Sequence, residues 1–528
     1  MTAPAADKGA AIQRRVLIGT LSNLISKVLN LGTWFFLTPF ILGHLGASTY
    51  GMWILVSSVV AYGNLLDFGV AAAVTKYVAD FKARGQLSDA QPLVATALWL
   101  YAGLGLAAFG LSVVLAPLFP ALFDVPPDLA PQAQRLVVLS GAVLGLSLPC
   151  AASSAILRGL QRFDLSSLIG TVGMSLYAAL TVAVLLGGGG VEGLVALNLP
   201  LTLFMQIPTL WLIHRAAPEL RLGVRGASRK LVRLVFSYSS ALFVINVAGQ
   251  LQTKTDEIVI GAFMPVANVT PYSLARRLSE LPNTLTDQFM RVLMPLAAQL
   301  HAEADEVRLR GLYITSTRLT LAIGLPMVAG LALLSRPFLL LWVGPEFANS
   351  AAVVIVLVLA SWVDTSQWPA SSILQGMARH RPLAILSLFT GLANLLISVV
   401  LVGPLGVLGV ALGTLIPAII ESWIILTPYS LRQLGVSVRT ALRLIIWPAL
   451  APAVPLVIVL AVLDWLLRPA SYLALACIGA AGAGVYALGY LALTAGQPEH
   501  IMARQAAGRA GAWLKRLAQR SGPPPNGP

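Results

Sequence analysis

The stretch Ile156-Leu157-Arg158-Gly159-Leu160-Gln161-Arg162 recurs 217 residues later as Ile373-Leu374-Gln375-Gly376-Met377-Ala378-Arg379. Two shorter pairs have almost the same offset. They are Gly190-Val191-x-Gly193 with Gly406-Val407-x-Gly409, and Ile41-Leu42-Gly43 with Val259-Ile260-Gly261. Three pairs in the same order at nearly one spacing predict that the chain contains an internal duplication.

The composition places both copies in a membrane. Of the 528 residues, 57% are hydrophobic and 11% are charged, and the mean hydropathy is +0.82; a soluble chain is about 25% charged. A water-soluble enzyme and a disordered protein are therefore excluded. Nucleic-acid binding is excluded too, because the basic residues behind the net charge of +14 are scattered through short gaps between apolar runs. Cys150 and Cys477 lie in apolar runs, the five histidines lack ligand spacing, and no metal or other cofactor is expected.

The apolar runs predict an all-α, polytopic membrane protein. A helix needs about 20 apolar residues to cross a hydrocarbon core of about 30 Å. Fourteen stretches qualify: 16–41, 52–74, 92–116, 135–157, 165–187, 191–213, 235–261, 272–297, 312–334, 351–374, 383–402, 405–427, 444–466 and 472–494. The repeat offset corresponds to six spans, and an even number keeps the orientation, so the halves are predicted to be parallel repeats that enclose a cavity near the bilayer midplane.

This pattern predicts five segments along the chain. They are an N-terminal six-helix bundle (1–213), a basic cytoplasmic linker (214–234), a second six-helix bundle (235–427), two extra transmembrane helices (428–494) and a basic cytoplasmic tail (495–528).

Lysine and arginine predict the orientation. With the N-terminus in the cytoplasm, the inside segments hold 27 of the 35 Lys and Arg residues, and the outside loops hold only Arg336 and Arg468. Arg14 and Arg15 precede an apolar run that is too long for a cleavable signal, so the first span is expected to remain. The prediction is a multi-pass protein of the bacterial inner (cytoplasmic) membrane with both termini cytoplasmic.

Polar residues follow one helix face in three spans. Residues three or four apart share a face, and a charge at the centre of a span costs about 2.5–3.5 kcal/mol, so such a face is expected to avoid lipid. The stripes are Asn23, Lys27, Asn30 and Trp34 in the first span; Asn246, Gln250, Lys254 and Glu257, with Asp256 beside them, in the seventh; and Arg276, Glu280, Asn283, Asp287 and Arg291, with Arg277 beside them, in the eighth.

Two interpretations of these charges stay open. Arg276 with Glu280 and Asp287 with Arg291 could neutralise each other locally, and Asp67 in the second span could cap or pair nearby. Lys27 has no acid within a turn on its own helix. The alternative is a cationic cavity that binds a phosphate or pyrophosphate. Its candidate residues are Lys27, Lys254, Arg276, Arg277, Arg291, Asn23, Asn30 and Trp34. Candidates for ion coupling or charge balance are Asp67, Asp256, Glu257, Glu280, Asp287 and Asp364.

Five short motifs stand out in the N-terminal half: Leu42-Gly43, Tyr50-Gly51-Met52-Trp53, Leu65-Leu66-Asp67-Phe68-Gly69, Thr75-Lys76-Tyr77-Val78-Ala79 and the Leu157–Arg162 loop. These motifs resemble the polysaccharide and O-antigen (Wzx-type) flippases of the multidrug/oligosaccharidyl-lipid/polysaccharide exporter superfamily. The resemblance implies a flippase that moves undecaprenyl-pyrophosphate-linked oligosaccharide from the inner to the outer leaflet by alternating access. It implies that basic residues from the first two helices of each half line the cavity; Asp67 in the second span departs from that pattern.

Other functions stay open at this point. A peptidoglycan-precursor (lipid II) flippase shares the fold and the anion, a drug/cation antiporter would need an acidic pocket, and a glycosyltransferase would need a larger outer loop. No Gly-x-x-x-x-Gly-Lys run exists, so transport energy would come from the membrane potential, a coupled ion or removal of product. The expected partners are the lipid-linked oligosaccharide, membrane lipids, a polysaccharide polymerase and glycosyltransferases.

Overall fold

The computed structural model is a helical protein. It describes residues 5–220, 223, 226–495 and 497, and it leaves undescribed the side chains of 5–29, 236–242, 245, 285, 288, 289 and 291. Helix accounts for 88% of the structure, and there is no strand in the part of the chain that is described. The prediction of an all-α membrane protein is confirmed.

In the described part of the chain, ten helical stretches are long and apolar enough to cross a membrane. Two of them, Asn30–Ala83 and His380–Gln433, are 54 residues long. The first covers the end of the first predicted span and the whole second span, and the other covers the eleventh and twelfth. The ten include every predicted span except the seventh and eighth, whose polar stripes make them less apolar. The protein is therefore a multi-pass membrane protein, and the count of fourteen spans stays a prediction.

The chain divides into two compact units. Unit 1 comprises Met1–Arg277 and Arg381–Pro417, and unit 2 comprises Leu278–His380 and Ala418–Pro528. The elements of unit 1 are α1 (Ala5–Ala61), η1 (Tyr62–Asp67), α2 (Val70–Ala83), η2 (Leu87–Ala90), α3 (Gln91–Leu115), α4 (Phe119–Leu122), α5 (Ala130–Gly159), α6 (Phe163–Leu186), α7 (Gly190–Ala196), α8 (Asn198–Ala216), α9 (Arg229–Phe263), η3 (Val266–Asn268), most of α10 (Val269–Ser279) and most of α15 (His380–Ile419).

Unit 2 contains the remaining elements. They are α11 (Leu281–Ala302), α12 (Glu306–Trp342), η4 (Pro345–Ser350), α13 (Ala351–Thr365), α14 (Trp368–Gly376), the π-helical η5 (Ile420–Leu426), α16 (Thr427–Gln433), α17 (Val438–Ala441), the π-helical η6 (Leu442–Ile446), α18 (Trp447–Leu450), α19 (Ala453–Leu467) and α20 (Tyr472–Leu493).

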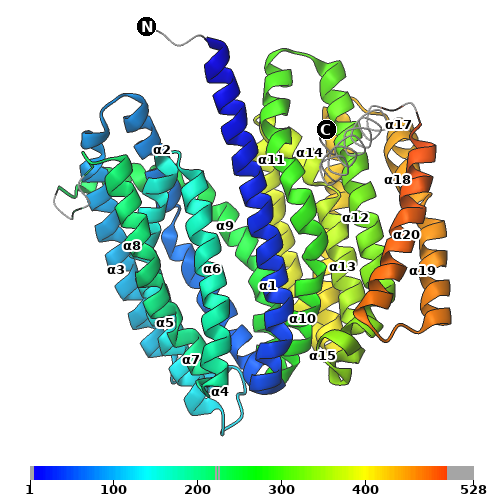
Figure 1. Ribbon diagram of the computed structural model, residues 1–528, viewed down its shortest axis with the longest axis horizontal. Helices are drawn as coiled ribbons and strands as arrows, with labels where there is room; N and C mark the ends of the chain where they lie inside the picture. Colours follow the sequence, from blue (N-terminus) through cyan, green and yellow to red (C-terminus); the bar gives the residue numbers. More distant parts are fainter. Residues whose placement is uncertain (1–4, 221–222, 224–225, 496, 498–528) are drawn as a thin grey trace, which may run out of the picture. The chain divides into compact units, whose positions relative to one another are not determined.

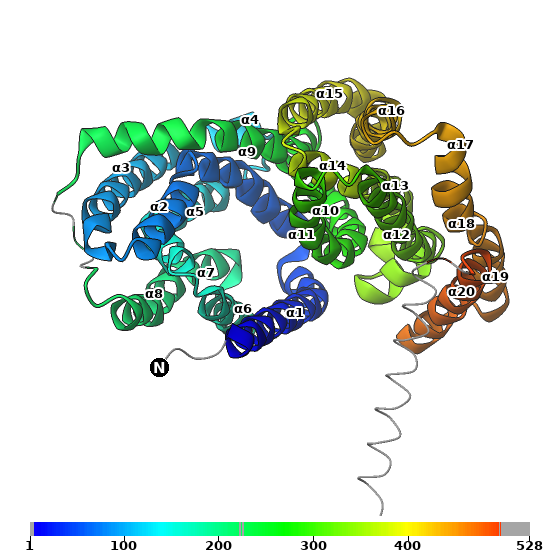
Figure 2. The same ribbon diagram turned by 90° about the horizontal axis from the view of Figure 1, so that it is seen from above.

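Each unit has its own apolar core. In unit 1, α2, α3 and α5 lie side by side (Figures 1 and 2) and bury Val74, Tyr101 and Leu157. In unit 2, α12 packs against α19 and α20 around Leu456 and Tyr486. Burial of such side chains against neighbouring helices fixes which face of each helix points inward.

Two long helices are each two spans joined at a glycine. Gly46 inside α1 has φ 74° and ψ 165°, and Gly406 inside α15 has φ 59° and ψ −139°. Both lie in the left-handed half of conformational space, where a side chain is disfavoured and glycine is not. The first and second spans therefore meet at Gly46, and the eleventh and twelfth meet at Gly406.

The two copies of the repeated stretch fold alike. Gln161 and Ala378 have φ of 59° and 60°. In the first copy the amide of Arg162 donates to the carbonyl of Leu157 at 3.2 Å, and in the second the amide of Arg379 donates to that of Leu374 at 2.9 Å. Each copy therefore ends its helix with the same left-handed cap.

The repeated stretch also places a glycine against an equivalent helix in each copy. A Cβ on Gly159 would lie 2.9 Å from the carbonyl oxygen of Thr75 in α2, and one on Gly376 would lie 2.7 Å from that of Met294 in α11. Both glycines permit a close approach between backbones. The folded geometry thus agrees with the predicted duplication.

Replacing Gly376 with alanine is expected to lower the melting temperature of the purified protein, because overpacking a tight contact costs about 1–3 kcal/mol. Gly330 in α12 is the matched control, since a Cβ there meets nothing within 4 Å. Gly330→Ala is expected to leave the melting temperature unchanged or to raise it. Thermal denaturation in one detergent compares the variants, and equal melting temperatures would contradict the tight contact at Gly376.

Candidate functional site

Part of the predicted site lies outside what the structure describes. The side chains of Asn23, Lys27 and Arg291 fall on undescribed positions, so their predicted roles stay predictions. Among the described candidates, Asn30 is exposed and Lys254 is half-buried.

Asp256 is the centre of a buried polar cluster in unit 1. Its side chain is 0% exposed, and its Oδ2 lies 3.3 Å from Nη1 of Arg276, whose side chain is 14% exposed. The hydroxyl of Tyr272 donates to the same oxygen, and so does that of Thr414 at 2.9 Å. Asp256 therefore joins α9 to α10 and α15, and the charge of Arg276 is balanced by an acid on another helix.

Further polar contacts extend this cluster. Asn394 Nδ2 donates to Thr414 Oγ1 at 3.1 Å, and Arg276 Nη2 donates to the carbonyl of Gln252 at 3.4 Å. We call Asp256, Tyr272, Arg276, Asn394 and Thr414 the Asp256 cluster.

Three buried oxygens in or beside the Asp256 cluster have no hydrogen-bond partner among the described residues. They are Oδ1 of Asp256, Oδ1 of Asn394 and Oε2 of Glu257. A buried acceptor without a donor is costly and rare in folded proteins. Carboxylate, amide and hydroxyl oxygens are the groups that bind a proton or a small hard cation.

Arg277 is held in a different environment from its neighbour Arg276. Its guanidinium lies 4.3 Å from the ring centroid of Trp34 in α1, and its Nη1 donates to Thr38 Oγ1 at 3.5 Å. Within the described chain, no carboxylate is at ion-pair distance from Arg277 or from Lys254. The structure therefore brings together two predicted site residues, Trp34 and Arg277, and leaves Arg277 without an acidic counter-charge there.

Asp67 is engaged locally. Its Oδ1 accepts a hydrogen bond from the amide of Ala71 at 3.2 Å and another from the hydroxyl of Tyr101. An acceptor at this position caps the first turn of α2. The cap that the sequence left open as an alternative is thus present.

The second predicted span is broken rather than continuous. Helix α1 ends at Ala61, η1 follows, Phe68 and Gly69 are left-handed with φ of 45° and 75°, and α2 begins at Val70. The prediction of one helix over 52–74 was wrong here, because two successive left-handed residues cannot continue a helix. We call this region (residues 62–69) the span-2 break.

Helix α9 satisfies polar groups at the span-2 break. Gln250 Nε2 donates to the carbonyl of Ala61 at 3.2 Å, and the hydroxyls of Tyr62 and Thr255 share a hydrogen bond of 2.5 Å. Phe68 stacks on Phe243 with centroids 4.9 Å apart. One part of the polar stripe in the seventh span therefore supports a broken helix.

The remaining acidic candidates lie on unit 2. Glu280 precedes α11 and is exposed, and Asp287 is half-buried. Asp364 in α13 is exposed and accepts a hydrogen bond from Trp368 Nε1 at 3.1 Å.

Sequence reasoning missed three residues of the Asp256 cluster: Tyr272, Asn394 and Thr414. Each is a single uncharged polar residue in an apolar stretch, so its type carries no signal by itself. Among the described residues there is no group of three or more His, Cys, Asp or Glu side chains that could hold a metal ion.

The sequence matches a known family over most of its length. A profile of the family described as "Polysaccharide biosynthesis protein" matches residues 44–352. The "Uncharacterized membrane protein EpsK" of Bacillus subtilis (strain 168) is 22% identical over 440 residues, which cover 81% of this chain and 85% of that protein. The "Succinoglycan biosynthesis transport protein ExoT" of Rhizobium meliloti (strain 1021) is 24% identical over 345 residues, 65% of each chain.

The fold is shared with a solved flippase. The structure titled "Lipid II flippase MurJ, inward closed conformation" superposes with a TM-score of 0.70 at 15% sequence identity, covering 89% of this chain and 98% of that one. At this identity the likeness concerns the fold. Together with the profile match, it confirms the resemblance that the short motifs indicated.

Proposed function

The chain belongs to the polysaccharide biosynthesis protein family, and from that membership we propose that it is a flippase for undecaprenyl-pyrophosphate-linked oligosaccharide. It moves this substrate from the inner to the outer leaflet of the bacterial cytoplasmic membrane by alternating access, for export of surface polysaccharide. The observation that carries the proposal is the family match over residues 44–352. The relative ExoT, a succinoglycan biosynthesis transport protein, supports the same class of substrate.

The pyrophosphate is recognised by cations that lack an internal counter-charge. Arg277 and Lys254 are the best supported of the predicted set, since no described carboxylate pairs with either. A guanidinium presents several donors in a planar fork that suits phosphate oxygens. Trp34 orients this fork by stacking. The other members of the predicted set are Lys27, Arg291, Asn23, Asn30 and Arg276, the last of which is paired with Asp256.

Asp256 is the proposed coupling residue. Oδ2 of its buried carboxylate accepts three hydrogen bonds, from Tyr272, Arg276 and Thr414. Oδ1 of Asp256 and Oδ1 of Asn394 have no hydrogen-bond partner among the described residues. A proton or Na⁺ bound there would satisfy both oxygens. Loss of that cation would leave an uncompensated polar site in the bilayer, which links occupancy to conformation.

The placement in the membrane follows the positive-inside pattern, with both termini in the cytoplasm. The proposed organisation is two six-helix repeats (1–213 and 235–427) joined by the basic linker 214–234, followed by two helices and a basic tail. Glycosyltransferases act before transport, and a polymerase acts after it.

Deleting the gene from its host is expected to abolish surface polysaccharide and to make lipid-linked oligosaccharide accumulate in the cytoplasmic leaflet. Expression of the full chain in the deletion strain is expected to restore surface polysaccharide and to remove the accumulated lipid-linked oligosaccharide, which is measured in radiolabelled lipid extracts. Rescue of a strain depleted of its lipid II flippase, without effect on polysaccharide, would identify the rival peptidoglycan-precursor flippase. Efflux of a cationic dye alone would identify a drug antiporter.

A further inference from the structure

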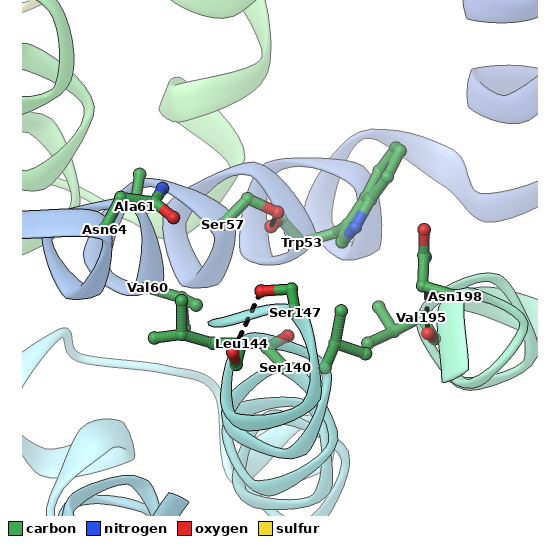
Figure 3. A pocket seen from close by; sticks show the side chains of 11 residues that line it. Trp53, Ser57, Val60, Ala61, Asn64, Ser140, Leu144, Ser147, Val195 and Asn198 are labelled. Atoms are coloured by element: carbon green, nitrogen blue, oxygen red, sulfur yellow. Dashed lines mark hydrogen bonds between the residues drawn. The ribbon is translucent and has the colours of Figure 1, made fainter. Parts of the chain in front are cut away.

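Unit 1 contains a cavity that none of the predicted site residues lines. Its volume is about 310 Å³, at the lower end of small-molecule sites. Figure 3 shows its walls, formed by α1 and η1 on one side and by α5 and the α7–α8 junction on the other. The lining residues on which the argument depends are Trp53, Ser57, Asn64, Ser140, Ser147 and Asn198. We call this the α1–α5 cavity.

Two polar helix faces meet across the α1–α5 cavity. Trp53 and Ser57 are four residues apart in α1, and Ser140 and Ser147 are seven residues apart in α5 on the opposite wall. Such steps put side chains on one side of a helix. Asn64 joins the first wall from η1. Polar side chains at this depth are disfavoured against lipid, so their convergence indicates a space that holds water or a polar ligand.

A helix interruption lies at one end of the cavity. Asn64 lies in the span-2 break, where a Cβ on Gly63 would meet Leu144 of α5. At the other end, α7 continues into α8 through Leu197, which keeps helical φ and ψ, and Asn198 Nδ2 donates to the carbonyl of Leu194 at 3.0 Å. In transporters, interrupted helices inside the membrane are typical of substrate sites, where the irregular backbone lines a cavity.

The polar groups of the cavity are neutral and partly unused. Ser57 Oγ donates to the carbonyl of Trp53 at 2.7 Å and Ser147 Oγ to that of Leu144 at 2.9 Å, so each hydroxyl oxygen keeps lone pairs for a ligand. The amide of Asn64 and the hydroxyl of Ser140 have no hydrogen-bond partner among the described residues. No lining residue is charged.

These observations exclude the common charged ligands from the cavity. A phosphate would need a cation there, and a cationic drug would need an acid or an aromatic cage. Neutral donors and acceptors beside an indole ring suit a sugar ring, which has hydroxyl groups at its edge and apolar C–H groups on its faces.

We propose that the α1–α5 cavity binds one neutral sugar residue of the lipid-linked glycan, separately from the pyrophosphate. The proposal rests on the proposed function, since it assigns a second subsite for the same substrate. It also assigns the roles: Asn64, Ser57, Ser140 and Ser147 hydrogen-bond the sugar hydroxyls, and Trp53 contributes an apolar wall.

Binding to two lipids that differ only in the sugar tests this subsite. The full chain in lipid nanodiscs is titrated with undecaprenyl pyrophosphate and with undecaprenyl pyrophosphate that carries one hexose. The wild-type protein is expected to bind the glycosylated lipid about tenfold more tightly, as two or so neutral hydrogen bonds provide. The Asn64→Ala/Ser147→Ala double variant is expected to bind both lipids equally, with its affinity for the bare pyrophosphate unchanged.

Two further variants separate the possible failures. Ser335→Ala in α12 is the matched control, since Ser335 Oγ also donates to a carbonyl three residues earlier, at 3.0 Å, but lies far from the cavity in sequence and in the other unit. Ser335→Ala is expected to keep the tenfold preference for the glycosylated lipid, whereas Arg277→Ala is expected to weaken the binding of both lipids by a similar factor. If wild type binds both lipids equally, the cavity holds only water and the subsite is refuted, while the flippase proposal stands. If neither lipid binds, the flippase proposal itself fails.

Discussion

Replacing Arg277 with alanine is expected to reduce polysaccharide export at least about tenfold while the protein stays folded. The reason is that Arg277 has no carboxylate partner in the described chain, so the substitution leaves no buried acid without its counter-charge. What is lost is a charge-assisted contact to the substrate, and truncating such a contact commonly costs 2–5 kcal/mol. Export is measured in the deletion strain, at protein amounts matched by immunoblot.

Two controls make the result on Arg277 specific. Arg135→Ala removes an arginine whose side chain is 58% exposed and which pairs with Glu192 at 2.8 Å, so it is expected to change export little. Arg277→Lys keeps the charge but loses the planar stacking on Trp34, and an intermediate loss is expected. Normal export by Arg277→Ala would overturn the assignment of this residue to the substrate headgroup.

Replacing Asp256 with asparagine is expected to abolish transport and any dependence of transport on a proton or Na⁺ gradient. The substitution also leaves Arg276 without its buried partner, and breaking a buried pair from one side costs about 3–5 kcal/mol. A loss of activity in this variant alone therefore does not distinguish coupling from folding.

The double variant Asp256→Asn/Arg276→Gln makes that distinction. It removes both charges, so neither side chain is left as an uncompensated buried charge. If Asp256 binds the coupling cation, the double variant melts near the wild-type temperature, and its rate of lipid flipping in proteoliposomes no longer responds to a Na⁺ or a pH gradient. Loss of a headgroup contact by Arg276 alone would lower the rate but keep that response. Gradient-driven transport at the wild-type rate by a stable double variant would reduce the pair to a structural role. The response to each gradient in the wild type identifies the cation.

The duplication and the helical class could be predicted from the sequence because both depend on local pattern. The two copies of the loop at 156–162 and 373–379 carry the same cap, and capping involves residues only a few positions apart. Trp34 and Arg277 were both predicted site residues. The contact between them could not be predicted, since nothing local connects residues 243 positions apart.

The Asp256 cluster was beyond prediction for the same physical reason. Asp256 accepts a hydrogen bond from Thr414, which is 158 positions away in the chain. The cost of burying a carboxylate predicts that such a partner exists, but it does not identify the residue. The span-2 break was missed for another reason. Its apolar run gives a strong signal for a helix, while the left-handed pair at Phe68 and Gly69 is stabilised by contacts that the run does not encode, such as Phe68 on Phe243.

The span-2 break also limits how the protein can move. Sliding α9 along its neighbour would break the hydrogen bond from Gln250 to the carbonyl of Ala61 and the one between the hydroxyls of Thr255 and Tyr62. We therefore expect the two segments to move together in a conformational cycle. Thr255, whose hydroxyl shares a hydrogen bond with that of Tyr62, is the neighbour of Asp256 in the sequence. Tyr62 is two residues from Asn64. A displacement of α9 at Asp256 would therefore be transmitted through Thr255 and Tyr62 to Asn64, which lines the α1–α5 cavity.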